Sequence, residues 1–178
     1  MGQYYKAISI DADECIEPWD YEEGAKLMEH SYIGNNTVNA VESLISKNGN
    51  WHNTRIVWAG DYADNEINSE HNLYSLTDNK VNPATNSKFG FRYIVNSTKM
   101  QFIDKKKIKK DADGYRIHPL PLLTAEGNGR GGGDFRKDDN RIGSWARDKI
   151  FATNTKPKGY EEIDGQFEEK LRPLKESH

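Results

Sequence analysis

The sequence predicts an α+β fold, in which a mostly antiparallel sheet carries two helices packed on one face. Short runs of aromatic and β-branched residues recur along the chain and are separated by turns rich in Asn, Asp, Gly and Ser, as is typical of strands. A helical spacing of apolar residues is clear only in the N-terminal half. The 178 residues are expected to form a single domain, 1–178, which is long enough for a hydrophobic core.

One strand and two helices are predicted before residue 50. Residues 4–10 predict a strand that runs into an acidic turn. Residues 22–32 predict a short helical stretch. A longer helix is predicted by four apolar residues at positions i, i+3, i+6 and i+7, namely Val38, Val41, Leu44 and Ile45. We expect Asn36 or Thr37 to cap this helix and left-handed residues at 48–50 to end it.

The remaining strands are predicted from short apolar runs. Residues 55–59 predict a buried strand, and residues 91–95 and 100–103 predict a hairpin across a turn at 96–99. Residues 117–125 contain Pro119 and Pro121, so we expect an extended entry followed by a strand at 122–124. Residues 142–152 predict a further strand.

Two further segments are polar. Residues 65–90 are rich in Asn and Ser and predict a long surface excursion with a short helix near 73–76. A polar tail begins at about residue 157 and contains one weak helical segment near 167–171.

Composition and charge limit the class of protein. The net charge of -3 excludes a generally basic surface, so nucleic acid is not an expected partner. Five lysines at residues 105–110 could contact a phosphate, although a solvated edge is the expected explanation. Cys15 is the only cysteine, which excludes an intrachain disulfide and a cysteine-based zinc site. Neither a signal peptide nor a membrane-spanning apolar run is seen, so we expect a cytoplasmic protein without a membrane partner.

The densest local feature is a glycine-rich segment, because five of the seven residues from 127 to 133 are glycine. Successive glycine amides can form a concave nest for an anion, and Arg130 could bind the same anion in bidentate fashion. The segment matches the dinucleotide fingerprint Gly-x-Gly-x-x-Gly, but no helix is expected directly after it, and the Lys-Ser/Thr of a P-loop is missing. The alternative is a flexible connection in which Arg130 pairs with a nearby acid.

The predicted ligand site centres on this segment. The acids that flank it could hold Arg130, accept hydrogen bonds from ribose or base edges, or share a metal. An aromatic side chain such as Trp58, Tyr62 or Trp145 would supply a stacking surface. The segment and its flanks contribute Glu126, Asn128, Gly129, Arg130, Gly131, Gly132, Gly133 and Asp134.

Five stretches of the sequence carry a resemblance: residues 1–7, 27–32, 57–64, 117–134 and 143–146. The fourth stretch leads through Ile117 and His118 into the glycine-rich segment. In these stretches, which cover less than half of the chain, the protein resembles a family of uncharacterised proteins encoded by bacteria and their phages. The resemblance implies a bacterial or phage setting and no particular mechanism. In the resembling proteins glycine often stands at the position of Arg147, so this arginine is expected to add a cation near the site.

Three functional hypotheses follow. We prefer a small binding protein for a phosphorylated, nucleotide-like ligand, without a cofactor or metal, which in a phage would sequester a nucleotide signal of host defence. The alternative is a metal-dependent phosphoesterase or nuclease, whose catalytic residues would be Asp61, Asp134, Asp148 and His118 around a divalent cation. That alternative requires the carboxylates to converge. The third hypothesis is a protein-binding inhibitor that uses residues 65–90, and association into a homo-oligomer stays open in each case.

Overall fold

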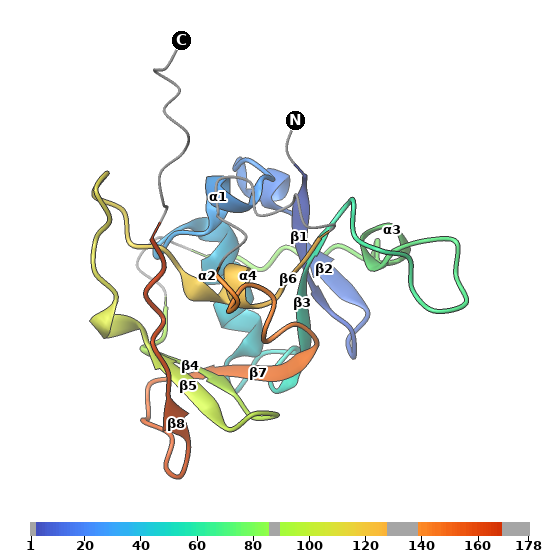
Figure 1. Cartoon of the computed structure of the whole chain (residues 1–178). Coiled ribbons are helices and arrows are strands. Elements are labelled where there is room, and N and C mark those ends of the chain that lie inside the picture. Colours follow the sequence, from blue (N-terminus) through green and yellow to red (C-terminus); the bar gives the residue numbers. More distant parts are fainter. Residues whose placement is uncertain (1–2, 86–89, 128–138, 169–178) are drawn as a thin grey trace.

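The computed structural model describes residues 3–85, 90–127 and 139–168 and has the predicted α+β fold (Figure 1). Eight strands in this described part form one mostly antiparallel sheet. The strands are β1 (Tyr5–Ser9), β2 (Glu14–Ile16), β3 (Thr54–Gly60), β4 (Tyr93–Asn96), β5 (Gln101–Asp104), β6 (Ala125–Glu126), β7 (Asp148–Thr153) and β8 (Glu161–Glu162). The helices are α1 (Leu27–His30), α2 (Asn36–Ile45), α3 (Leu73–Leu76) and α4 (Pro119–Leu123), with 3₁₀ turns at Pro18–Tyr21 and Lys105–Lys107.

Strand β3 is the branching point of the sheet, because it pairs with three strands, β1, β6 and β7. The strand order is β2-β1-β3-β7-β4-β5-β8, and β6 pairs with β3 outside this path. Neighbouring strands are antiparallel except for the two parallel pairs, β3 with β6 and β5 with β8. The predicted hairpin is confirmed, since β4 and β5 pair with Tyr93 opposite Asp104. The strands predicted near residues 4–10 and 55–59 are likewise present, as β1 and β3.

The two faces of the sheet carry different layers, because side chains alternate along each strand. On one face, Ile56 and Trp58 of β3 join Ile150 of β7 in the main core, together with apolar side chains of α1, α2 and α4. On the other face, Val57 of β3 belongs to a smaller cluster against which Leu73 of α3 packs. The sequence predicted two helices on one face. The structure adds α4 to that face and places α3 on the other side.

Two side chains cap the N-terminus of α2. The side chain of Asn35 accepts a hydrogen bond from the backbone N–H of Thr37 at 2.9 Å. The carboxylate of Glu23 accepts from the backbone N–H groups of Asn36 and Thr37 at 3.1 and 3.0 Å, and also from the Thr37 hydroxyl. A carboxylate in this position suits the positive end of the helix dipole. The helix start is therefore fixed by local sequence and by one acid from the preceding loop.

The predicted left-handed end of α2 is wrong. The helix ends at Ile45, and Ser46 follows with extended backbone at φ -71°. None of residues 48–50 has a positive φ. Gly49 is needed for space instead, because an added Cβ would lie 2.0 Å from the carbonyl oxygen of Leu44.

The strand predicted at residues 122–124 is also wrong, because Pro119–Leu123 forms helix α4. His118 is its N-cap, and the ring Nδ1 accepts a hydrogen bond from the backbone N–H of Leu120 at 3.2 Å. Both prolines fall in the first turn, where backbone N–H groups have no acceptor within the helix. The helix is buried along its whole length, which its apolar sequence allows.

The predicted surface excursion is tied to the edge strand β2. The backbone of Cys15 donates to the carbonyl of Asn79 and accepts from the N–H of Val81, both at 2.9 Å. The ammonium of Lys6 in β1 reaches the carbonyl of Thr77 at 2.5 Å. The short helix predicted near residues 73–76 is confirmed as α3.

The tail after residue 157 contributes to the fold. Its strand β8 extends the sheet beside β5, and Phe167 is fully buried under the guanidinium of Arg141, 4.1 Å from the ring centroid. A helical segment was predicted at 167–171. Phe167 and Glu168 are not helical, and residues 169–171 lie outside the described residues. Every helix in the described part of the chain is too short or too polar to cross a membrane.

Candidate functional site

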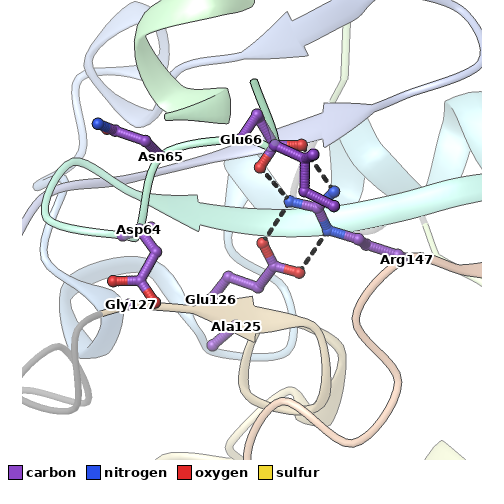
Figure 2. Close-up of a pocket in the computed structure, with 9 residues that line it drawn as sticks. Asp64, Asn65, Glu66, Ala125, Glu126, Gly127 and Arg147 are labelled. Atoms are coloured by element: carbon purple, nitrogen blue, oxygen red, sulfur yellow. Dashed lines mark hydrogen bonds and ion pairs between the residues drawn. The ribbon is translucent and has the colours of Figure 1, made fainter. Parts of the chain in front are cut away.

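A cleft of about 630 Å³ lies beside the ends of β3 and β6 (Figure 2). The loop after β3 forms one wall, β6 and Gly127 form the other, and Arg147 reaches in from the segment before β7. The lining residues are Ala63, Asp64, Asn65, Glu66, Ile67, Ala125, Glu126, Gly127 and Arg147. The volume lies within the range of about 300–1,000 Å³ that is usual for small-molecule sites.

Arg147 joins the two walls of the cleft. Its guanidinium donates to the carboxylate of Glu66 at 2.8 and 2.7 Å and to that of Glu126 at 2.6 and 2.8 Å (Figure 2). The hydrogen bonds to the two carboxylates raise the pKa of Arg147. The hydrogen bonds between Glu66 and Arg147 also lower the pKa of Glu66. Together, the hydrogen bonds to Glu66 and Glu126 occupy four of the five guanidinium N–H groups, so Arg147 fixes the cleft wall, and the charge that it adds near the site is balanced by two carboxylates.

The backbone of Arg147 is held in an unusual conformation. Its φ of 68° lies in the left-handed region, which costs a residue with a Cβ about 1 kcal/mol. Its N–H donates to the carbonyl of Ile56 in β3 at 2.8 Å, and its side chain is fixed by the two carboxylates. A strained residue with this many contacts is held by its surroundings. The backbone contact with β3 and the two carboxylates together therefore set the position of the guanidinium.

Strand β6 positions Glu126. It runs parallel to β3, with Glu126 opposite Ala59, and the backbone N–H of Trp58 donates to the carbonyl of Thr124 at 2.9 Å. Gly127 follows at a point of close approach, since an added Cβ would lie 2.7 Å from Gln3 Oε1 and 2.8 Å from the Tyr5 hydroxyl. The opposite wall is thus a rigid extension of the sheet.

The described walls of the cleft are acidic. They carry three carboxylates, Asp64, Glu66 and Glu126, against the single guanidinium of Arg147, which gives a formal charge of -2. The arrangement offers hydrogen-bond acceptors, and Asn65 adds an amide that can donate or accept. Such walls suit hydroxyl and amino groups better than a phosphate.

Most of the predicted glycine-rich site lies outside the described residues. This applies to Asn128, Gly129, Arg130, Gly131, Gly132, Gly133 and Asp134. Of the predicted ligand residues that are described, Glu126 and Arg147 meet in the cleft, and Gly127 places the start of the glycine-rich segment on its wall.

The expected role of two tryptophans in ligand stacking is wrong. Trp58 and Trp145 are 0% and 1% exposed, and both belong to the main core. Their indole N–H groups donate to His30 Nε2 at 2.9 Å and to Gln101 Oε1 at 3.0 Å. Neither ring has a face for a ligand. Tyr62 is 42% exposed in the loop after β3 and is the predicted aromatic residue that a ligand could reach.

Asp61 and Asp148 do not converge. Asp148 lies opposite Ile56 in the β3–β7 pairing, whereas Asp61 follows the end of β3, five residues or roughly 16 Å further along. Asp148 accepts hydrogen bonds from Asn96 at 2.8 Å and from Lys99 at 2.5 Å. Asp61 accepts from the backbone N–H of residue 4 at 3.0 Å. The third predicted carboxylate, Asp134, lies outside the described residues.

His118 is fully buried and belongs to a separate polar network. Its Nε2 lies 2.6 Å from Glu42 Oε2, which also accepts from Lys105 at 2.5 Å. Burial lowers the pKa of His118, and the ring is neutral because Nδ1 accepts from the N–H of Leu120. Lys105 is therefore a buried ion-pair partner and not part of a solvated edge. The contacts of His118 are with Glu42 and Leu120, whereas Asp61 and Asp148 have other partners. Among the described residues, no group of three or more His, Cys, Asp or Glu could hold a metal ion.

In the loop that forms the second wall, Asn65 and Glu66 were not predicted as site residues. They follow soon after a buried strand, and polar residues near a strand end are the signal that could have found them. The pairing of Glu66 with Arg147 spans 81 residues, so no local pattern contains it.

In comparisons with known proteins, no family model, no curated protein and no solved structure matches this chain.

Proposed function

We propose that this protein binds a small phosphorylated, nucleotide-like ligand and holds it without turning it over. One observation carries the proposal. Glu126 and Arg147, both expected from the sequence to contact a ligand, meet in one cleft at the residue where the glycine-rich segment begins.

The polar part of such a ligand suits the described walls of the cleft. Carboxylate oxygens of Asp64 and Glu126 and the amide of Asn65 can accept hydrogen bonds from ribose hydroxyls and from amino groups of a base. Tyr62 lies just before this loop and is exposed enough to contact a base. The pairing of Arg147 with both walls keeps the acceptors in place before the ligand arrives, which reduces the entropic cost of binding.

The phosphate is expected at the glycine-rich segment. The acidic walls of the cleft disfavour a phosphate, while glycine amides and Arg130 are the chemistry that favours one. Asn128 follows Gly127 in the chain, so a ligand in the cleft would be adjacent to the beginning of that segment.

The separation of Asp61, Asp148 and His118 favours binding over turnover. The phosphoesterase alternative needs these three residues together with Asp134, which lies outside the described residues. The three have different partners and lie in three different environments. In the phage setting that the resemblance implies, a protein of this kind would sequester a nucleotide signal of host defence.

The proposal is tested by titration calorimetry with nucleoside monophosphates, cyclic nucleotides and the corresponding nucleosides. We expect Glu126→Gln to weaken nucleoside and nucleotide alike by about tenfold, because it removes a charged acceptor of the sugar or base. Arg130→Ala should weaken only the nucleotide and reduce its affinity to that of the nucleoside. Chromatography after incubation should return the ligand intact, whereas a changed ligand would support the enzyme alternative.

The matched control is Asp11→Asn. Asp11 accepts two hydrogen bonds from the guanidinium of Arg55, both at Oδ1, and this pair lies at the opposite end of β3 from Glu126 and Arg147. This variant should bind as the unchanged protein does. If none of the nucleotides produces heat or raises the melting temperature, or if both acid variants weaken binding equally, the cleft is not the ligand site.

A further inference from the structure

A second hollow, of about 320 Å³, is lined by cations and apolar side chains. It lies between the segment after α1, the entry to β4 and the 3₁₀ turn after β5. Its lining residues are Ile33, Phe91, Arg92, Lys105, Lys106 and Arg116. Four of these six are basic and none is acidic, although the chain as a whole has a net charge of -3.

Backbone pairing brings the walls of this basic hollow together. The N–H of Lys105 donates to the carbonyl of Arg92 at 2.8 Å, and the N–H of Ile33 donates to that of Arg116 at 2.8 Å. The guanidinium of Arg116 links the two pairs through the carbonyl of Lys105 at 2.6 Å, so four chain segments are held side by side. The hollow is thus a feature of the fold and not of one flexible loop.

Two of the four cations are neutralised by carboxylates. Lys105 donates to the buried carboxylate of Glu42 at 2.5 Å. Arg92 forms a bidentate pair with Asp104 at 3.0 Å for both hydrogen bonds. These two cations shape the hollow and add little net charge to it.

The other two cations keep their charge. The guanidinium of Arg116 donates to the backbone carbonyls of Ile108 at 2.9 Å and of Lys105 at 2.6 Å, which fix its position without cancelling its charge. The ammonium of Lys106 is exposed and has no partner among the described residues. The hollow therefore presents two uncompensated positive charges, one held rigidly and one free to move.

The apolar part of the lining lies beside these charges. Ile33 and Phe91 are half-buried and face the same hollow. An aromatic side chain next to cations that have no carboxylate partner suits a particular kind of ligand, one with an anionic group close to an apolar or planar group.

We propose that this basic hollow is a binding site for a small phosphate monoester. Its phosphate, which carries a charge of about -1.5 to -2 at neutral pH, matches the two uncompensated cations, Lys106 and Arg116. Its organic part packs against Ile33 and Phe91. The volume of about 320 Å³ lies near the lower end of the range for ligand sites, which favours a small molecule over a nucleic-acid strand.

The test uses phenyl phosphate as the probe, with phenol and inorganic phosphate as its two halves, in NMR or calorimetric titrations of the full chain. Phenyl phosphate should bind more tightly than either half. Lys106→Gln should weaken it about tenfold, as expected for the loss of one charge-assisted hydrogen bond. Lys106 is exposed and unpaired among the described residues, so this variant should fold normally.

Lys110→Gln is the matched control, because Lys110 is an exposed lysine of the same run that does not line the hollow. It should change the affinity less than twofold. The proposal would be overturned by any of three results. Phenyl phosphate could fail to bind, both lysine variants could weaken its binding equally, or a single-stranded oligonucleotide could bind more tightly than phenyl phosphate. Glu126→Gln should leave phenyl phosphate binding unchanged, so the two proposed sites can fail independently.

Discussion

Acidification should destabilise this protein through one buried histidine, His30. His30 is the last residue of α1, and its ring is fully buried. Its Nδ1–H donates to the carbonyl of Gly24 at 3.0 Å, and its Nε2 accepts from the indole N–H of Trp58 at 2.9 Å. A proton added at Nε2 would face the Trp58 N–H and remove this hydrogen bond. Burial accordingly lowers the pKa of His30 to about 4 from the ordinary 6.5, although the hydrogen bond to Gly24 partly opposes the shift.

The size of the effect follows from proton linkage. Between the two pKa values the unfolded chain binds the proton and the folded chain does not, so stability is full above pH 6.5 and falls as the pH drops toward 4. With these values the loss is about 0.8 kcal/mol at pH 6, about 2 kcal/mol at pH 5 and about 3 kcal/mol at pH 4. A loss of 3 kcal/mol is a large fraction of the roughly 5–15 kcal/mol that stabilises a typical domain.

The assay is urea unfolding of the unchanged protein and of His30→Gln at several pH values. Other groups with lowered pKa values, such as the buried His118, contribute to the pH dependence of both proteins. The difference in unfolding free energy between the two proteins isolates His30. At neutral pH the variant should be less stable, because the hydrogen bonds to Trp58 and Gly24 are disturbed. This difference should shrink by about 2 kcal/mol between pH 7.5 and pH 5.

A difference that stays constant over this range would refute the reasoning. It would mean that the buried ring accepts a proton as easily as the unfolded chain does. The chemical shifts of the His30 ring protons give an independent check, since they should not titrate until the pH falls well below 6.

Three further predictions concern stability, each measured by urea unfolding. Glu23→Gln should cost about 1 kcal/mol, because it removes the negative charge that caps α2 at Thr37. Glu42→Gln should cost about 3–5 kcal/mol, because it leaves the buried ammonium of Lys105 without a carboxylate. Gly127→Ala should cost about 1–3 kcal/mol, because the added methyl group would meet side chains that are packed beneath β6.

Each of these predictions has an outcome that contradicts it. A Glu23→Gln variant as stable as the unchanged protein would show that Asn35 alone caps the helix. For Glu42 the informative control is the double change Glu42→Leu with Lys105→Met, which removes both charges and should recover much of the loss. If the double variant is no better than Glu42→Gln, the ion pair is not the cause. A stable Gly127→Ala protein would mean that the contact at β6 is loose.

Much of the fold could be predicted because its signals are local. The apolar spacing of α2 and the aromatic and β-branched runs of β3, β4 and β5 occur within single elements. Helix α4 was missed because proline usually argues against regular structure, whereas Pro119 and Pro121 stand in the first turn and lose no hydrogen bond there. The sequence shows both prolines but not the cap that makes the helix start at that point.

The candidate site was less predictable because its contacts are long-range. Glu126 could be named from its place beside the glycine-rich segment, but Glu66 binds Arg147 across 81 residues. Trp58 was named as a stacking surface because tryptophan suits stacking, although the run at 55–59 also predicted a buried strand. In the structure both faces of β3 are covered, so all residues from 56 to 60 are buried, which confirms the buried strand for residues 56–59 and excludes the stacking role.

The two edges of the sheet limit how this protein can bind another protein. At the β2 edge, the chain from Asn79 to Val81 occupies the outer backbone hydrogen-bonding groups of Cys15. At the β5 edge, the two-residue strand β8 pairs with β5, and the N–H of Glu161 donates to the carbonyl of Met100 at 2.9 Å. Short, charged edge segments of this kind resist the addition of a further strand. A partner that recognises proteins by β-augmentation would first have to displace one of them. Self-association or capture by another protein should therefore proceed through side-chain surfaces and leave the order of strands unchanged.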